Sequence, residues 1–319
     1  MDQSDIDLAR KVGRIFMPHA WKRRDEFQKA EGRYVHYTSA EAGLNIIRSK
    51  SIWMRNTTCM ADYSEVQHGF AKLQSEDMLK GLLRWLDVEL NGLGREAASL
   101  FDQWWNDTRF GTFIASISEH EASEDLHGRL SMWRAFGGQS ARVAFVLKIP
   151  ENPTVGLLLN LFISPVAYFR DNQLSTEISA VLQNVRESLE FLKLVDRKVL
   201  VGALFIMLVS ASVCLKHEGF HEEKEWRIVY NPKRAHSDFM KSSIESVGGV
   251  PQLVYKIPIG GGPPDGLSEI NIGALLDRLI IGPTQYSWAM YEAFVAALKD
   301  AGVEKAEEKV FVSGIPIRS

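Results

Sequence analysis

The order of helical and extended segments along the chain is the feature that most constrains its fold. The first third is mostly helical in pattern, with leucines that recur three and four residues apart. The last third instead contains short β-branched and aromatic runs of strand length. Because helices and strands do not alternate regularly, we expect an α+β fold with a mostly antiparallel β-sheet and helices packed around it.

Local patterns place the individual elements. Strands are predicted at residues 33–38, 51–54, 111–118, 141–150, 163–169, 225–230, 252–258, 277–283 and 309–313. Helices are predicted near the N-terminus and at residues 39–49, 62–107 and 287–301, and two helices are predicted over residues 174–215. Thr38 and Glu41 form a candidate capping box for the helix at 39–49. Without repeats or low-complexity tracts, the sequence predicts one domain over residues 1–319, with an N-terminal helical extension at 1–30 and a helical insertion at 62–107.

The overall charge and the cysteine content exclude several classes of protein. The formal net charge is −3, so the chain has no global attraction to phosphate and non-specific nucleic-acid binding is not expected. Two cysteines, Cys59 and Cys214, are too few for a disulfide framework or a thiolate zinc site. They are typical of a reducing compartment, and the N-terminus lacks the pattern of a secretory signal. We therefore expect a cytoplasmic protein.

One uncharged stretch, Val199 to Leu215, raises the question of a membrane helix. Its length is at the short end of what spans a bilayer core of about 30 Å. The stretch is also single, internal and directly followed by a charged segment with strand-like sequence. A helix buried in a large core is therefore the better prediction, and we expect no membrane partner.

The segment His217-Glu218-Gly219-Phe220-His221 matches the H-E-x-x-H pattern of zinc hydrolases, in which two histidines on one helix bind the metal. Gly219 stands where the preceding apolar helix is expected to end, and a strand is predicted to begin soon after His221. The two imidazoles would then not share a helix face, and the third ligand is poorly supplied. A zinc hydrolase is therefore an alternative only, and we assign no metal ligand.

Three further segments place polar and aromatic groups on predicted strands or at their ends. The first is residues 34–38, where alternation puts a histidine and a threonine on the same side. The second is residues 131–138, which combine aromatic rings with a double glycine. The third contains Glu223 and Glu225, which would share one face of a strand. Each segment taken alone has an ordinary structural explanation.

Together these segments resemble a bacterial family of unknown function, family 2971. The run YVHYTSAEAGLNIIRSKSIWM resembles the opening of the family. The segment MADYSEVQHG corresponds to the family's next motif, of which it keeps only the acidic residues Asp62 and Glu65. In SMWRAFGG, Phe136 stands where the family often has tyrosine. The resemblance covers nearly the whole chain, from Arg33 to Arg318, through EEKEWRIVY, RLIIGP and VFVSGIPIR.

The layout of that family is similar to the ADP-ribosyltransferase fold, whose His-Tyr-Glu branch has a first-strand histidine, a mid-domain aromatic residue and a late-strand glutamate. This similarity implies a split sheet that binds NAD in its cleft, and either transfer of ADP-ribose to a protein or nucleic acid or hydrolysis of NAD. Proteins of this kind often act as toxins or in defence against phage. Nicotinamide leaves NAD as a neutral group, so one carboxylate suffices to stabilise the oxocarbenium-like transition state.

Carried over by position, the resemblance assigns the catalytic carboxylate to Glu225 or Glu223, and the other glutamate would orient the acceptor. His36 would hydrogen-bond a ribose hydroxyl, with Tyr37 and Thr38 beside it. Which glutamate takes which part is open.

The remaining assignments concern the nicotinamide ring and the pyrophosphate. Trp133 and Phe136 would pack near the ring. Arg134 and Arg227 are candidates for the pyrophosphate, and ion pairs with the acidic residues of the MADYSEVQHG segment are their structural alternative. The whole assignment requires His36 and a late glutamate to face each other across one solvent-accessible crevice.

A non-enzymatic interaction or regulatory module is the first alternative to the enzyme. In that case the histidine, tryptophan and glutamate residues of these motifs would form a structural network. Their replacement would lower stability, and NAD would not change the melting temperature.

Overall fold

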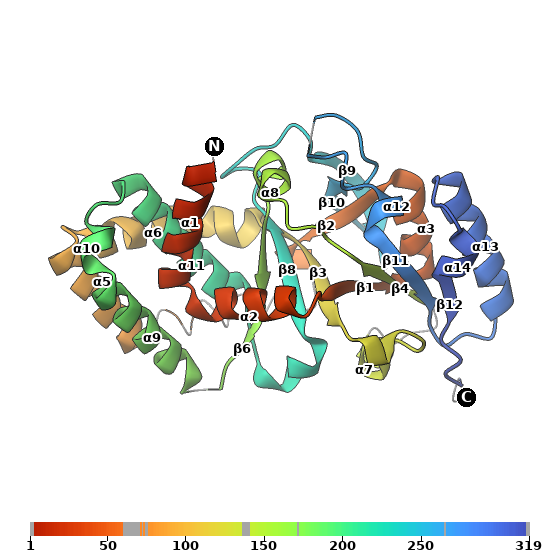
Figure 1. The fold of residues 1–319 in the computed structure, drawn as a ribbon, viewed down its shortest axis with the longest axis horizontal. Helices are drawn as coiled ribbons and strands as arrows, with labels where there is room; N and C mark the ends of the chain where they lie inside the picture. Colours follow the sequence, from red (N-terminus) through yellow and green to blue (C-terminus); the bar gives the residue numbers. More distant parts are fainter. Residues whose placement is uncertain are drawn as a thin grey trace.

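A large β-sheet runs through the middle of the molecule (Figure 1). The computed structural model describes residues 3–59, 71, 73, 76–135, 141–170, 172–264 and 266–316. Within these residues ten strands form one sheet in the order β12-β11-β4-β1-β3-β2-β10-β9, with β8 paired to β3 and β5 paired to β8. The strands are β1 (Arg33–Ser39), β2 (Ser51–Asn56), β3 (Phe113–His120), β4 (Arg142–Leu147), β5 (Phe162–Pro165), β8 (Glu225–Tyr230), β9 (Lys241–Val247), β10 (Val250–Pro258), β11 (Leu276–Ile281) and β12 (Val310–Val312).

The pairing of these strands is antiparallel, apart from the parallel pair β11 and β12. A separate short parallel pair joins β6 (Ala167–Tyr168) to β7 (Leu215–Lys216). The described residues therefore confirm the prediction of an α+β fold with a mostly antiparallel sheet. The likeness to the ADP-ribosyltransferase fold stays a prediction.

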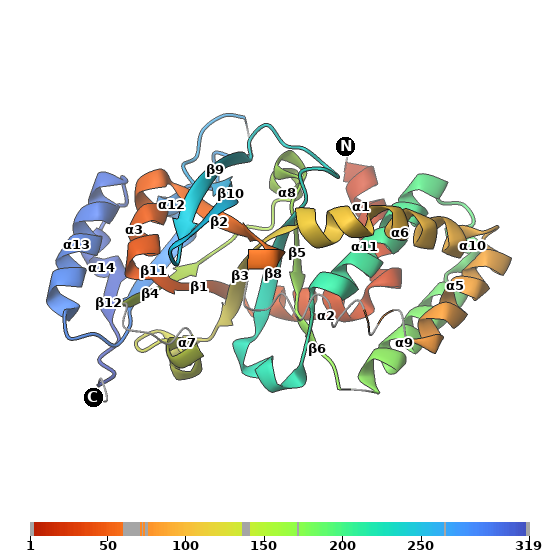
Figure 2. The same ribbon diagram turned by 180° about the vertical axis from the view of Figure 1, so that it is seen from behind.

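Helices gather at the two ends of the sheet, as the front and back views agree (Figures 1 and 2). One end holds α1 (Gln3–Phe16), α5 (Asp77–Glu89), α6 (Leu93–Gly111), α9 (Gln173–Glu187), α10 (Leu189–Leu192) and α11 (Arg197–Val213). The other end holds α3 (Ala40–Ser49), α12 (Ile272–Leu275), α13 (Ser287–Asp300) and α14 (Ala306–Lys309). The remaining helical elements are α2 (Pro18–Lys29), α7 (Leu130–Ala135), α8 (Pro153–Leu159), η1 (Thr57–Cys59), η2 (Ala122–Glu124) and η3 (Glu218–Glu223).

Local chemistry explains most element boundaries. Pro18 is the first residue of α2, which separates that helix from α1. The helix α3 begins with Ser39 as its N-cap, because the Ser39 hydroxyl accepts a hydrogen bond from the backbone N–H of Ala42 at 3.1 Å. The N-cap is therefore Ser39 and not the predicted Thr38, one residue earlier. The long helical prediction at 62–107 divides into α5 and α6, and its first part, 62–70, lies outside the described residues.

The two faces of the sheet carry different residues, because directly paired residues of neighbouring strands point to the same side. One face, called here the Glu225 face, carries Val35, Tyr37, Ser116, Ser118, Glu225 and Arg227. The other, called the His36 face, carries Tyr34, His36, Ile117, Phe145 and Trp226. Tyr34 and Trp226 lie in the main apolar cluster, which includes buried residues of α3, α12 and α13.

A second apolar cluster fills the space between the end that holds α1, α5, α6, α9 and α11 and the Glu225 face of the sheet. It joins α1, α5, α6, α9 and α11 to Ile114 and Val229 of the sheet. The uncharged stretch at 199–215 supplies α11, whose Leu204, Phe205 and Leu208 are buried in this cluster. The prediction of a buried core helix is confirmed. Within the described residues, no helix has both the length and the apolar composition needed to cross a bilayer.

Replacement of Leu204 by alanine tests the role of α11 as a core helix. Leu204 is 0% exposed, so Leu204→Ala should lower the free energy of unfolding by about 2–5 kcal/mol through lost burial and a cavity. Leu194→Ala is the matched control, because Leu194 is 87% exposed and its loss should cost less than about 0.5 kcal/mol. Urea unfolding followed by circular dichroism measures both. Equal effects of the two replacements would contradict the assignment.

Candidate functional site

Glu225 lies at the start of β8 and is only 4% exposed. Arg227 donates from Nε to Glu225 Oε1 at 2.9 Å, and the Ser116 hydroxyl donates to the same oxygen at 2.5 Å. Lys216 Nζ is 3.5 Å from the other oxygen, Oε2. Burial by itself raises the pKa of Glu225, but the charges of Arg227 and Lys216 and these hydrogen bonds outweigh it, so the pKa lies below its ordinary value. Glu225 is therefore an ionised, buried carboxylate.

Its cationic partners are themselves bound to neighbouring elements. Arg227 is 0% exposed, and its Nη1 donates to the carbonyl oxygen of Val213 at the end of α11 at 2.5 Å. Lys216 Nζ donates to Glu223 Oε2 at 2.8 Å. Two carboxylates and two cations thus form one group, called here the Glu225 network, which also includes Ser116 and in which Glu225, Arg227 and Lys216 are buried. The network joins β8 to β3, β7, η3 and α11.

The two glutamates are brought together by a cation and not by strand alternation. Glu223 ends η3, and Lys224 has a positive φ of 44°, so that β8 begins only at Glu225. The prediction that Glu223 and Glu225 share one face of a strand is therefore wrong, because Glu223 lies in η3 and not in β8. Lys216 contacts both carboxylates and holds them near each other.

His36 lies on the opposite face of the sheet from Glu225. Its Nδ1 donates to the backbone carbonyl oxygen of Ser116 at 2.9 Å. Burial lowers the pKa of His36, and this hydrogen bond opposes the shift only in part, so the ring is neutral at pH 7. The ring lines a narrow pocket with Ile52, Phe145 and other apolar side chains, which has room for little more than a water molecule. Within the described residues, His36 and Glu225 therefore do not face each other across one crevice, contrary to the expectation from the sequence.

Tyr37 and Trp133 do come to the Glu225 face. The Tyr37 ring meets the Trp133 ring edge-to-face at 4.8 Å, and the Tyr37 hydroxyl accepts the backbone N–H of Arg129 at 2.8 Å. Trp133, in α7, donates from its indole nitrogen to the carbonyl oxygen of His127 at 2.8 Å. These two aromatic residues belong to a small buried cluster with Val35 and Met132, on the same face as the Glu225 network.

The other predicted site residues are dispersed. Thr38 lies on the same face of β1 as His36, opposite the Glu225 face. Arg134 is exposed on α7. Phe136, Asp62 and Glu65 lie outside the described residues. Of the predicted nucleotide contacts, Tyr37, Trp133 and Arg227 share a face with Glu225, whereas His36 and Thr38 do not.

The histidines of the H-E-x-x-H segment do not lie on an α-helix. The helix α11 ends at Val213, earlier than the predicted end at Gly219, and β7 and the 3-10 helix η3 follow. His217 is the N-cap of η3 and accepts the backbone N–H of Gly219, while His221 Nδ1 lies 3.0 Å from the carbonyl oxygen of Glu218. Among the described residues, no group of three or more His, Cys, Asp or Glu side chains is arranged to hold a metal ion. The alternative of a zinc hydrolase gains no support from this geometry.

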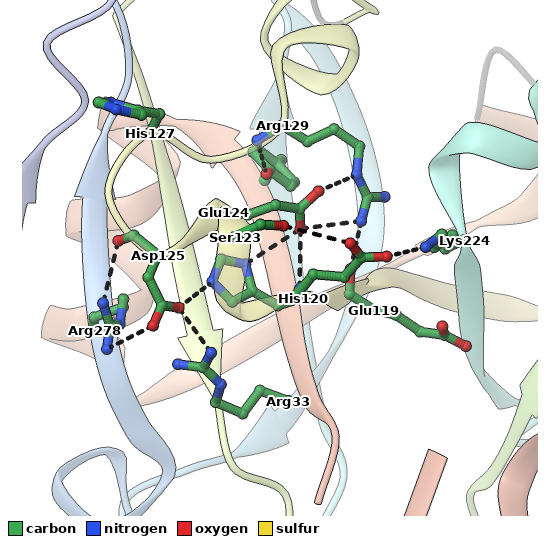
Figure 3. Close-up of polar contacts among 12 residues, drawn as sticks. Arg33, Glu119, His120, Ser123, Glu124, Asp125, His127, Arg129, Lys224 and Arg278 are labelled. Carbon is green, nitrogen blue, oxygen red and sulfur yellow. Dashed lines mark hydrogen bonds and ion pairs between the residues drawn. The ribbon is translucent and has the colours of Figure 1, made fainter. Parts of the chain in front are cut away.

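A second polar cluster surrounds His120 at the end of β3 (Figure 3). His120 Nε2 lies 2.9 Å from Asp125 Oδ1, and Asp125 also contacts Arg33 at 2.7 Å and Arg278 at 3.3 Å. Arg33 reaches Asp277 with its other terminal nitrogen at 2.7 Å. This cluster fixes the residues after β3 to the starts of β1 and β11. The sequence reasoning did not identify it, although the polar run EDLHGRL between two strands contains one of its members, Asp125.

Arg129 connects the His120 cluster to the Glu225 network. Figure 3 shows its contact with Glu124. It donates to the Glu124 carboxylate, to the carbonyl oxygen of Glu119, and to the carbonyl oxygens of Glu222 and Glu223 at 2.8 and 3.0 Å. A planar guanidinium suits such a role, because its donors point in several fixed directions. Arg129 therefore locks η2 and η3 to the end of β3.

Comparison with known proteins gives a match for part of this region. The model of a family described as a protein of unknown function, DUF2971, matches residues 132–228. The matched residues include Trp133, Glu223, Glu225 and Arg227, and they exclude His36. The match supports the family resemblance seen in the sequence. No curated protein and no solved structure matches the chain.

Asp277 makes the stability of the His120 cluster dependent on pH. Burial raises its pKa, but hydrogen bonds from Arg33, Lys148 and Arg278 outweigh this and lower the pKa to about 2. The contribution of a carboxylate with a lowered pKa is complete above its unfolded value near 3.9 and is lost as the pH falls towards about 2. Between pH 6 and pH 3, the wild type should therefore lose about 1 kcal/mol of unfolding free energy that Asp277→Asn does not lose. Urea unfolding at both pH values measures this difference.

Asp300→Asn is the control for that experiment, because Asp300 is exposed at the end of α13. Its pH dependence should equal that of the wild type. If Asp277→Asn also retained the wild-type pH dependence, the ion pairs of Asp277 would not stabilise the folded state.

Proposed function

We propose that this chain is a non-enzymatic interaction or regulatory module, in which His36, Trp133 and Glu225 stabilise the fold. The observation that carries the proposal is the state of Glu225, a carboxylate 4% exposed and bound by Arg227, Lys216 and Ser116. A carboxylate neutralised by two neighbouring cations has little field left to stabilise a positively charged transition state.

His36 and Trp133 have equally structural bonds. Ser116 links the faces of the sheet, since its backbone carbonyl accepts from His36 on one face and its hydroxyl donates to Glu225 on the other. Trp133 fixes the residues before α7 through the His127 carbonyl. Buried polar groups that are all bonded in this way rigidify a structure, and removal of one member leaves its partners unsatisfied.

Replacement of Glu225 by glutamine tests this role. Glu225→Gln leaves Arg227 and Lys216 buried against a neutral amide, so the free energy of unfolding should fall by about 3–5 kcal/mol. Glu222→Gln, an exposed neighbour on η3, should change it by less than about 0.5 kcal/mol. Millimolar NAD should leave the wild-type melting temperature unchanged, because a ligand stabilises only a protein that binds it. A saturable rise in melting temperature with NAD, absent in Glu225→Gln, would overturn the proposal.

Transfer of ADP-ribose from NAD to a macromolecule, or hydrolysis of NAD, is a second candidate function. The observation that favours it is the sheet register that puts Tyr37 on the same face as Glu225, with Trp133 packed on the Tyr37 ring. In this case Tyr37 and Trp133 would border the nicotinamide. Glu223, whose side chain is 22% exposed against 5% for Glu225, is better placed to reach the substrate. His36 would not contact NAD.

Labelled NAD distinguishes this candidate from the module. For an enzyme, incubation with cell lysate should give label transfer or nicotinamide release, and Glu223→Gln should reduce the rate by about a hundredfold or more. His36→Ala should retain the activity wherever the variant is folded, because the residue lies on the other face. If the wild type gave no label transfer and no nicotinamide release, the candidate would be excluded.

A further inference from the structure

A pocket lies where the helices of one end meet the sheet, apart from the Glu225 network. It is bordered by α6, α11, β5 and the residues that follow β8, which lie close together in Figure 2. Its lining includes Trp104, Asn160, Phe162, Phe205, Asn231 and Arg234. Three aromatic rings thus form apolar walls, and one guanidinium stands at the edge.

Arg234 brings a positive charge that no acidic side chain among the described residues balances. In the part of the chain that the structure describes, no carboxylate lies within ion-pair distance of Arg234, and the nearby Asp107 is paired with Lys233 at 2.5 Å. The residue as a whole is exposed, but its guanidinium lies 4.6 Å from the centre of the Phe205 ring. This partial removal from water lowers the pKa of Arg234 without bringing it near neutrality.

The segment that carries Arg234 is held in place before any ligand binds. Asn231 accepts the backbone N–H groups of Lys233 and Arg234 at 3.1 and 3.3 Å, and it donates to the carbonyl oxygen of Asp107 at 2.9 Å. Asn160 donates to the carbonyl oxygen of His236 at 2.6 Å. Both ends of the turn are therefore anchored, which reduces the entropy cost of binding at the guanidinium.

The size and charge of the pocket select the ligand. Its interior has room for a few water-sized groups and is walled by Trp104, Phe162 and Phe205, so it suits a short apolar chain. A single guanidinium matches a monoanion, and its fork of donors fits a carboxylate with two parallel hydrogen bonds. We propose that this pocket binds a small organic carboxylate, with the carboxylate on Arg234 and the apolar tail between the aromatic rings. Such a ligand would give the module a molecule to respond to, but the proposal does not depend on the module's function.

Butyrate is a suitable probe, and butyramide is its neutral counterpart of the same shape. In calorimetric titration of the full chain, butyrate should bind saturably and at least about tenfold more tightly than butyramide, because a hydrogen-bonded ion pair is lost with the amide. Arg234→Gln should weaken butyrate binding by at least about tenfold and leave butyramide unaffected. Arg84→Gln, the same change at an exposed residue of α5, should bind butyrate as the wild type does.

The comparison of the two ligands on the wild type needs no variant, so it is valid even if Arg234→Gln fails to fold. Absence of saturable butyrate binding, equal affinity for butyrate and butyramide, or full affinity in folded Arg234→Gln would each overturn the proposal. A melting curve of each variant establishes that it is folded.

Discussion

The buried ion pair between Glu225 and Arg227 is the interaction on which the centre of this structure depends. It lies on the sheet between two apolar clusters, one formed with α7 and the other with the long helices. A charge in such a place is tolerable only when it is paired and hydrogen-bonded. Lys216, Ser116 and the Val213 carbonyl supply the remaining contacts, so that helix, sheet and η3 are joined through polar groups where apolar packing is interrupted.

The separation of His36 from Glu225 bears on whether the sequence motifs that contain them form a single active site. Both residues contact Ser116, but they do so from opposite sides of β3. A single active site that uses both side chains would need them in one crevice. The geometry instead favours a rigid scaffold, in which His36 and Glu225 are both hydrogen-bonded to Ser116. Arg129 extends this scaffold to η2 and η3. The charge of Arg234, at a pocket elsewhere, is a different kind of feature, because it packs on the Phe205 ring and no carboxylate among the described residues pairs with it.

Much of the fold could be predicted, because helix and strand periodicities are local properties of the chain. The strands β1 and β2 and the helices α3 and α13 lie within about two residues of their predicted positions. The strand β9 was missed because its exposed, polar sequence KSSIESV has no apolar alternation, and only its pairing with β10 makes it a strand. The end of α11 was misplaced because a short strand, β7, replaces the last predicted turns.

The sequence by itself determined the fold class, the buried nature of α11, and the polar and aromatic residue types available to a site. These follow from composition and from patterns that repeat within a few residues. Only the tertiary structure decided which of those residues meet. Strand register, set by pairing between segments about eighty residues or more apart, put His36 and Glu225 on opposite faces. Such long-range pairing leaves no local pattern from which it can be inferred.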